Sequence, residues 1–168
     1  MESFEITFFC DKRMNYDSSN SSRVLKKLYY ESVHLNNEAV FETFDYEDND
    51  FYEVRCSIFG LELNEENFLP FINCIAVFVE KMFDTFDSCV FATGIYELTY
   101  YFIEKIHRIS DLKNILYKFP ICFLHGNSEA DTIEARILLR TPKMLCIFHE
   151  NAQQIINSDC APSQGRIV

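Results

Sequence analysis

Four residues of the chain have the types and spacing of a zinc site. The segments ICFLHG and LCIFHE each hold a cysteine followed three residues later by a histidine, giving the pairs Cys122 with His125 and Cys146 with His149. Thiolate and imidazole are the usual ligands of structural zinc, and two such pairs complete a tetrahedral set. Both pairs lie in predicted strands, where residues three apart point to opposite faces. We therefore expect buried cysteines followed by strand-end histidines, with no metal or other cofactor.

A second group of chemically capable residues is acidic. The stretch ETFDYEDND, residues 42–50, contains five carboxylates and no basic residue. Asp45, Glu47, Asp48 and Asp50 offer the oxygen ligands that Ca²⁺ and Mg²⁺ prefer. Their spacing does not fit a calcium-binding loop of the EF-hand type, because the glycine that such a loop requires is absent. We expect no divalent metal at this stretch.

Motifs of known enzyme classes are missing from the sequence. It contains no phosphate-binding glycine loop, no dinucleotide fingerprint, no zinc-protease helix motif and no serine-nucleophile elbow. Seven cysteines and four histidines occur together by chance in a chain of this composition. We predict that the protein is not an enzyme. One alternative stays open, a small enzyme that uses a Cys/His or an acidic metal site, because sites assembled from distant residues escape motif searches.

The net charge of −11 is concentrated in one part of the chain. Between Glu38 and Glu66 there are ten acidic residues and a single basic one, Arg55. A solvated turn explains two or three acids, but clustered like charge disfavours a compact state, so we predict a surface for a basic protein partner. Direct binding of nucleic acid or of an anionic membrane is not expected, because both require a basic surface. The predicted partner-binding residues are Glu42, Asp45, Tyr46, Glu47, Asp48, Asp50, Tyr52 and Glu53.

The length of the chain, the absence of a secretory signal, the reduced cysteines and the ETFDYEDND stretch give the chain a family resemblance. In these features it resembles the immunity proteins that neutralise bacterial polymorphic toxins, including those of contact-dependent growth inhibition. The resemblance implies a non-enzymatic inhibitor that binds a basic toxin domain, in particular a nuclease, and occludes its active site. A nucleic-acid mimic that blocks a defence protein is an alternative within the same class. Immunity families differ in fold, so the resemblance implies no architecture.

The elements that must position these residues are strands and helices in mixed order. Hydrophobic periodicity predicts strands over residues 3–10, 38–44, 50–59, 88–94, 121–126, 132–140 and 143–149, and helices over 23–33, 67–86, 95–109 and 110–118. A terminal helix or helical turn is expected over residues 150–157. The order predicts an α+β fold, a single domain with a largely antiparallel or mixed sheet packed against several helices.

Three of these elements carry more detailed expectations. The two strands on either side of residues 46–49 read as a hairpin, with one apolar face that includes Val54 and one solvated face that includes Glu53 and Arg55. The strand register leaves open whether Phe51 or Tyr52 faces the core. The helix from residue 67 is apolar almost all round, Val77 included, and is expected to be buried. In the helix over 23–33, Val24 and Leu28 are expected to face the core, with Leu25 as a further candidate.

Composition also bounds the organisation and compartment of the chain. With 168 residues and 48% hydrophobic residues, we expect a single globular domain over residues 1–157 and a flexible tail over 158–168. The N-terminal stretch lacks the basic and apolar regions of a secretory signal. Seven cysteines, an odd number, lie mostly in apolar segments, which is typical of reduced thiols. We therefore expect a cytoplasmic protein, with the oligomeric state left open.

Overall fold

The computed structural model describes residues 3–14, 21–86, 88–94, 106–114, 121–125, 136–141 and 143–148. Its elements are β1 (Ser3–Asp11), α1 (Ser21–Ser32), β2 (Ala39–Asp45), β3 (Phe51–Phe59), α2 (Phe68–Thr85), β4 (Cys89–Gly94), α4 (Ile109–Asn114), β5 (Ile121–His125), β6 (Arg136–Arg140) and β7 (Met144–Phe148). The predicted tail over 158–168, the expected terminal helix over 150–157 and residues 95–105 of the predicted helix over 95–109 lie outside the described residues. Residues 106–108 are described and are not helical, because helix α4 begins only at Ile109.

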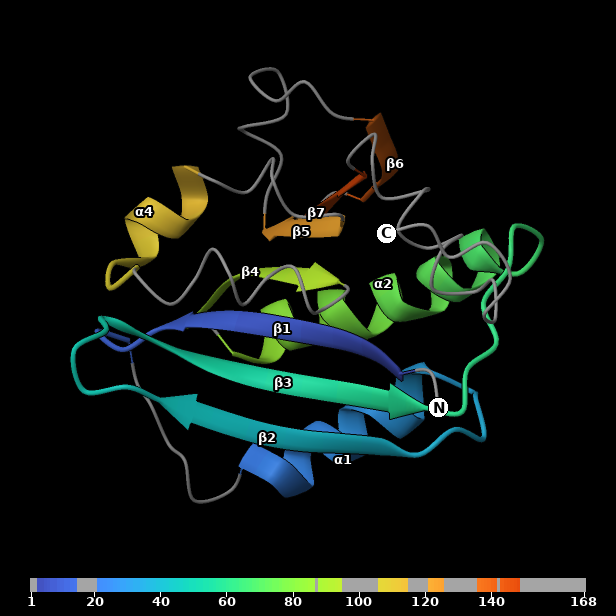
Figure 1. The fold of residues 1–168 in the computed structure, drawn as a ribbon, viewed down its shortest axis with the longest axis horizontal. Helices are drawn as coiled ribbons and strands as arrows, with labels where there is room; N and C mark the ends of the chain where they lie inside the picture. Colours follow the sequence, from blue (N-terminus) through green and yellow to red (C-terminus); the bar gives the residue numbers. More distant parts are fainter. Residues whose placement is uncertain are drawn as a thin grey trace, which may run out of the picture.

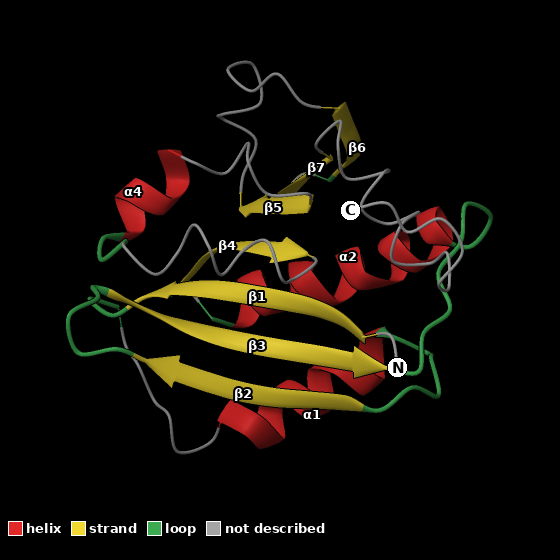
Figure 2. Cartoon of the chain, viewed as in Figure 1, coloured by secondary structure: helices red, strands yellow, loops and turns green. Residues whose placement is uncertain are grey.

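The strands of the described residues form one antiparallel sheet. Their order is β2-β3-β1-β4-β5-β7-β6, and every described ladder is antiparallel (Figures 1 and 2). β1 lies inside the sheet because it pairs with β3 on one side and with β4 on the other. β2 and β6 are the two edges. The chain is thus a single α+β domain, as the order of predicted elements indicated.

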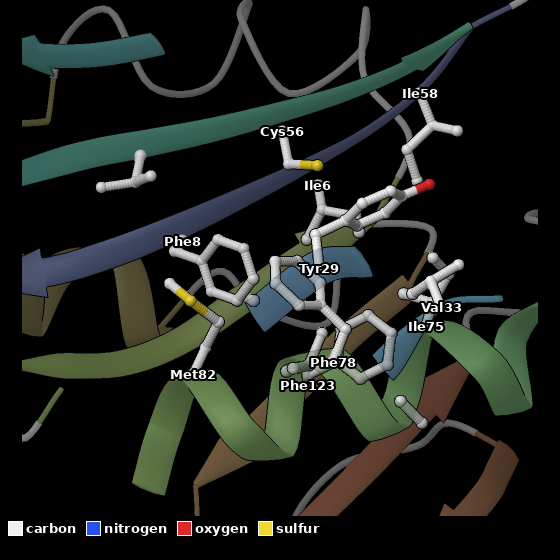
Figure 3. Close-up of a cluster of buried hydrophobic side chains, with 14 of the residues drawn as sticks. Ile6, Phe8, Tyr29, Val33, Cys56, Ile58, Ile75, Phe78, Met82 and Phe123 are labelled. Carbon is white, nitrogen blue, oxygen red and sulfur yellow. The ribbon is translucent and has the colours of Figure 1, made fainter. Parts of the chain in front are cut away.

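Helices α1 and α2 cover one face of this sheet. α1 contacts α2 and β2, and α2 also contacts β4 and β5. Phe78 of α2 lies at the centre of the core, with its ring centroid 5.6 Å from that of Phe8, 5.5 Å from that of Tyr29 and 6.2 Å from that of Phe41. Figure 3 shows Tyr29 between the strands and α2. These edge-to-face aromatic contacts attach β2 firmly to the rest of the domain.

Local side-chain bonds set the start of α2. Asn64 Oδ1 accepts hydrogen bonds from the backbone N–H groups of Glu66 and Asn67, at 2.9 and 3.0 Å. The helix then begins at Phe68, with Pro70 in its first turn, where a missing N–H costs nothing. The predicted start near residue 67 is confirmed. The residue after β3, Gly60, has a φ of 72°, a conformation that glycine adopts without steric cost.

The second face of β3 departs from the prediction. Val54, Cys56 and Ile58 face the helices as the alternation indicated, and the structure places Tyr52, whose side the sequence left open, with them. The opposite face was expected to be solvated, yet Phe51, Glu53 and Arg55 are also buried. The alternation of side chains along a strand predicts which residues share a face of the sheet. It does not predict whether a polar face becomes buried in the folded protein. Glu53 and Arg55 tolerate burial because they are paired with each other.

Two helix predictions are corrected at single positions. Val24 is exposed, so its prediction is wrong, whereas the candidate Leu25 is buried, together with Tyr29, on the core face of α1. Val77 of α2 is 47% exposed, although the helix buries nine other residues. An apolar side chain on a helix surface is common in folded proteins, so apolarity all round did not require burial all round. No helix within the described residues combines the length and apolarity needed to cross a bilayer.

Candidate functional site

Five of the eight predicted partner-binding residues lie together on the surface of the β2–β3 hairpin. We call this surface the acidic edge; it comprises Glu38, Glu42, Asp45, Tyr46, Glu47 and Asp48, all of which are exposed. The residues lie at the start of the edge strand β2, along it, and in the turn after it. The hairpin itself is confirmed, with β2 and β3 paired from Ala39 opposite Ile58 to Asp45 opposite Tyr52.

The acidic edge is long and carries little compensating charge. Glu38 and Asp45 are seven positions apart along the chain, which corresponds to about 23 Å of extended strand. Asp45 forms an ion pair with Lys12, the residue that follows β1. Within the described residues, the other four carboxylates of the acidic edge form no ion pair. The edge therefore presents a strip of negative charge to solvent.

Lys12 also fixes the backbone of the turn. Its ammonium donates a hydrogen bond of 2.7 Å to the carbonyl of Tyr46, and its backbone N–H donates one of 3.0 Å to the carbonyl of Asp50. Inside the turn, the N–H of Asn49 donates to the carbonyl of Tyr46 over 3.0 Å. The position of Tyr46, Glu47 and Asp48 is therefore set by the end of β1.

Asp50 connects the turn to α4 rather than to solvent. Its Oδ1 accepts a hydrogen bond of 2.7 Å from the backbone N–H of Ile109, the first residue of α4, and its own N–H donates to the carbonyl of His107 over 2.9 Å. His107 Nδ1 lies 2.7 Å from Asn49 Oδ1. Figure 1 shows α4 at the same end of the sheet as this turn. Asp50 is half-buried and has a structural role.

Tyr52 and Glu53 are buried and do not belong to the acidic edge. The Tyr52 hydroxyl lies 3.0 Å from Ser88 Oγ on the helix-covered face, and Glu53 is 1% exposed on the other face. Both were among the predicted partner-binding residues. The burial of Tyr52 follows from the antiparallel register, which places it beside Cys10 and among the core residues.

A buried charged cluster lies beneath the acidic edge, on the face away from α1 and α2. Arg55 donates a hydrogen bond of 3.2 Å to Glu53 Oε2, and its guanidinium lies 4.0 Å from the centroid of the Phe44 ring. Glu53 Oε1 has no hydrogen-bond partner among the described residues. Burial raises the pKa of Glu53, against the opposing effect of Arg55, and burial likewise raises the pKa of Glu5. This cluster thus places the ionisable side chains of Glu53 and Arg55 inside the fold, where they offer no exposed surface to a partner.

The possible zinc set, in which no metal was expected, is not brought together by its described residues. Cys122 pairs with Ile147 and Cys146 pairs with Phe123, so the two thiols lie on opposite faces of the sheet. His125 is exposed at the end of β5 and stacks on Phe83 of α2 at 5.1 Å, while His149 lies outside the described residues. Among the described residues, no group of three or more potential metal ligands occurs.

The comparisons with known proteins give no further direction. No family model, no curated protein and no solved structure matches the chain.

Sequence reasoning missed the residues that hold the hairpin in place. Lys12 stands in a polar stretch after the first strand, and His107 stands far along the chain. Neither position carries a local pattern that points to the turn. The signal for Lys12 was indirect. If the first and third strands pair in antiparallel fashion, Lys12, which follows the first strand, lies beside the residue that precedes the third strand.

Proposed function

We propose that this chain is a non-enzymatic inhibitor of the immunity-protein class, which binds a basic toxin domain through the acidic edge. The single observation that carries the proposal is the composition of that edge. Five exposed carboxylates follow one edge strand and its turn, and in the described residues only Asp45 is paired with a cation. Retaining such a strip costs free energy through like-charge repulsion, which an oppositely charged partner offsets.

The chemistry of the partner follows from this charge. A nuclease carries lysines and arginines around its active cleft to bind phosphates. A strip of carboxylates steers such a domain into contact and occupies the groups that otherwise bind nucleic acid. The inhibitor acts by occlusion, so no reaction takes place on this chain and no cofactor is needed.

Two further features of the edge suit it to binding. Its turn is held by hydrogen bonds from Lys12 and by the contacts of Asp50 with His107 and Ile109, so little conformational entropy is lost when a partner docks. Tyr46 is 50% exposed among the acids. An exposed tyrosine supplies contact area at low entropic cost, whereas charge alone contributes mainly to the association rate.

Affinity capture followed by an activity assay tests this function. The tagged full chain is incubated with lysate of its own cells at low salt, and bound protein is eluted with a rising salt gradient. We expect a basic protein that cleaves nucleic acid and loses that activity when a stoichiometric amount of the chain is added back.

Two results contradict the proposal. A captured partner that stays fully active when saturated with the chain rules out inhibition by occlusion. A partner that binds nucleic acid without cleaving it points to the nucleic-acid-mimic alternative.

A further inference from the structure

Two cysteines from neighbouring strands face each other in the core. Sγ of Cys10, in β1, lies 3.0 Å from Sγ of Cys89, at the start of β4. Their side chains are 1% and 2% exposed, respectively. The two positions are register partners in the β1–β4 ladder. Register partners on antiparallel strands have Cα atoms about 4.5–5.5 Å apart, within the range that a disulfide spans.

An irregularity in the ladder creates this contact. Phe8 pairs with Ala92 and Phe9 with Phe91, but the register then shifts so that Cys10 pairs with Cys89. Without the shift, Cys89 and Cys10 lie on opposite faces, because side chains alternate along a strand. With one extra residue on β4, both cysteines join the helix-facing core.

We propose that Cys10 and Cys89 are an oxidant-sensitive dithiol that closes to an intramolecular disulfide. With a peroxide as oxidant, one thiol is first oxidised to a sulfenic acid while the peroxide O–O bond breaks and one water leaves. The second thiol then attacks that sulfur, so the S–S bond forms and a second water leaves. Overall, the two thiols lose two protons and two electrons, and one peroxide is reduced to two waters. A dithiol reductant reverses the step.

The position of this pair determines what the disulfide does. The residue after Cys10, Asp11, donates its N–H to the carbonyl of Ser88 over 2.8 Å, and the next residue, Lys12, holds the acidic turn. A disulfide joins two positions 79 residues apart in the sequence and fixes this end of β1 to β4. Oxidation therefore stabilises the frame that carries the acidic edge. The inference does not depend on the identity of any partner.

Reaction is expected to be slow at neutral pH. The hydrogen bond with Cys10, together with burial, holds the pKa of the Cys89 thiol well above its usual value, so little thiolate is present. Oxidation should accelerate at alkaline pH and when the strand ends open locally.

The chain contains its own control pair. Cys122 and Cys146 are also buried on neighbouring strands, β5 and β7, but they point to opposite faces of the sheet. If oxidation required only burial and sequence composition, this pair would also become linked. Geometry predicts that it stays reduced.

Peptide mapping of the oxidised full chain tests the proposal. The protein is treated with hydrogen peroxide under native conditions, then unfolded, alkylated and digested for mass spectrometry. We expect a linked peptide pair that contains Cys10 and Cys89 and disappears after reduction, while Cys122 and Cys146 are recovered alkylated. The linked protein should have a higher Tm by on the order of 5–10 °C.

Variants separate this link from general oxidation. Cys89→Ala should abolish the peroxide-dependent rise in Tm, and Cys122→Ala should retain it. If Cys89→Ala does not fold, the wild-type peptide map decides the matter alone. Failure to find the Cys10–Cys89 link after prolonged treatment, or its appearance only alongside random links among all cysteines, overturns the proposal.

Discussion

The Asp50 carboxylate accepts a hydrogen bond from the backbone N–H of Ile109 across 2.7 Å. This contact joins the acidic turn to the first residue of α4, where backbone N–H groups have no partner within the helix. A carboxylate is also well placed there, because the N-terminus of a helix carries partial positive charge. Asp50 thus stabilises the fold, while its acidic neighbours Glu47 and Asp48 remain exposed on the surface.

Replacing Asp50 should therefore cost stability. We expect Asp50→Ala to lower the free energy of unfolding by about 1–2 kcal/mol, since a charge-assisted bond to a helix end is lost. Asp50→Asn keeps an acceptor oxygen and should cost less. Asp48→Ala, two residues away on the exposed turn, is the control and should change stability by less than about 0.5 kcal/mol. Urea denaturation measures all three, and equal costs for Asp48 and Asp50 would contradict the assigned roles.

The buried carboxyl of Glu53 should make stability depend on pH. Burial raises its pKa in the folded protein above the ordinary 4.5, so the folded state holds the proton more tightly than the unfolded state. The stabilising contribution of Glu53 is complete below pH 4.5 and is lost as the pH rises through the raised value. The side chain in Glu53→Gln does not titrate. The free energy of unfolding of this variant, measured relative to that of wild type, should therefore increase as the pH rises from 4.5 to 7.

Denaturation curves over that pH range check the prediction for Glu53. Two other charged groups act on this carboxyl, Arg55 and Glu5. Glu62→Gln, at an exposed loop position, serves as a control for the loss of one negative charge. A stability difference between wild type and Glu53→Gln that is constant with pH would show that Glu53 titrates alike in the folded and unfolded states.

The native thiols should react in the order of their exposure. Cys74 of α2 is half-buried and the other described cysteines are buried. Burial raises the pKa of Cys56, and it raises that of Cys146 to about 12. With iodoacetamide at neutral pH, we expect Cys74 to be modified first among the described cysteines, as followed by peptide mapping. A buried cysteine that reacts faster than Cys74 would instead favour the small-enzyme alternative.

Tyr46 should contribute affinity to the proposed complex. Replacing it with alanine removes the exposed aromatic ring at the turn, so we expect the Kd for the captured partner to rise more than tenfold, mainly through faster dissociation. The matched control is Tyr30→Ala on α1, because Tyr30 is 48% exposed and Tyr46 is 50% exposed. Surface plasmon resonance separates the two rate constants. If both substitutions weaken binding equally, Tyr46 has no special role.

The hairpin shows how far the sequence could go. Alternation between Val54 and Ile58, with turn residues around Asp48, predicted the strands, their antiparallel pairing and the apolar side of β3 at these positions, because these depend on local periodicity. The side of Tyr52 stayed open until the register was known. The insertion of β1 between β3 and β4 was not predictable, since it depends on pairing between segments far apart in the chain. The covering of Glu53 had no sequence signal for the same reason.

The candidate site was predictable in part. A count of charges located the acidic edge, because Glu42, Glu47 and Asp48 stand in one short stretch. Their division of roles required the structure, since Asp45 and Asp50 differ from these three only in being near Lys12 and Ile109. The Cys10–Cys89 contact was equally hidden, because it depends on a register shift within one ladder.

The association rate of the captured partner with two charge-matched triple variants tests the central claim most directly. One variant, Glu42→Gln with Glu47→Gln and Asp48→Asn, neutralises three of the five carboxylates of the acidic edge and leaves Glu38, Asp45 and the structural Asp50 in place. The other neutralises three exposed acids of the loop before α2, namely Glu62, Glu65 and Glu66. At low salt, the first variant should associate at least about tenfold more slowly than wild type and lose most of its salt dependence, while the second changes less than about threefold. Equal rates for the two variants, or an unchanged rate for the first, would contradict the claim that the acidic edge binds a basic partner.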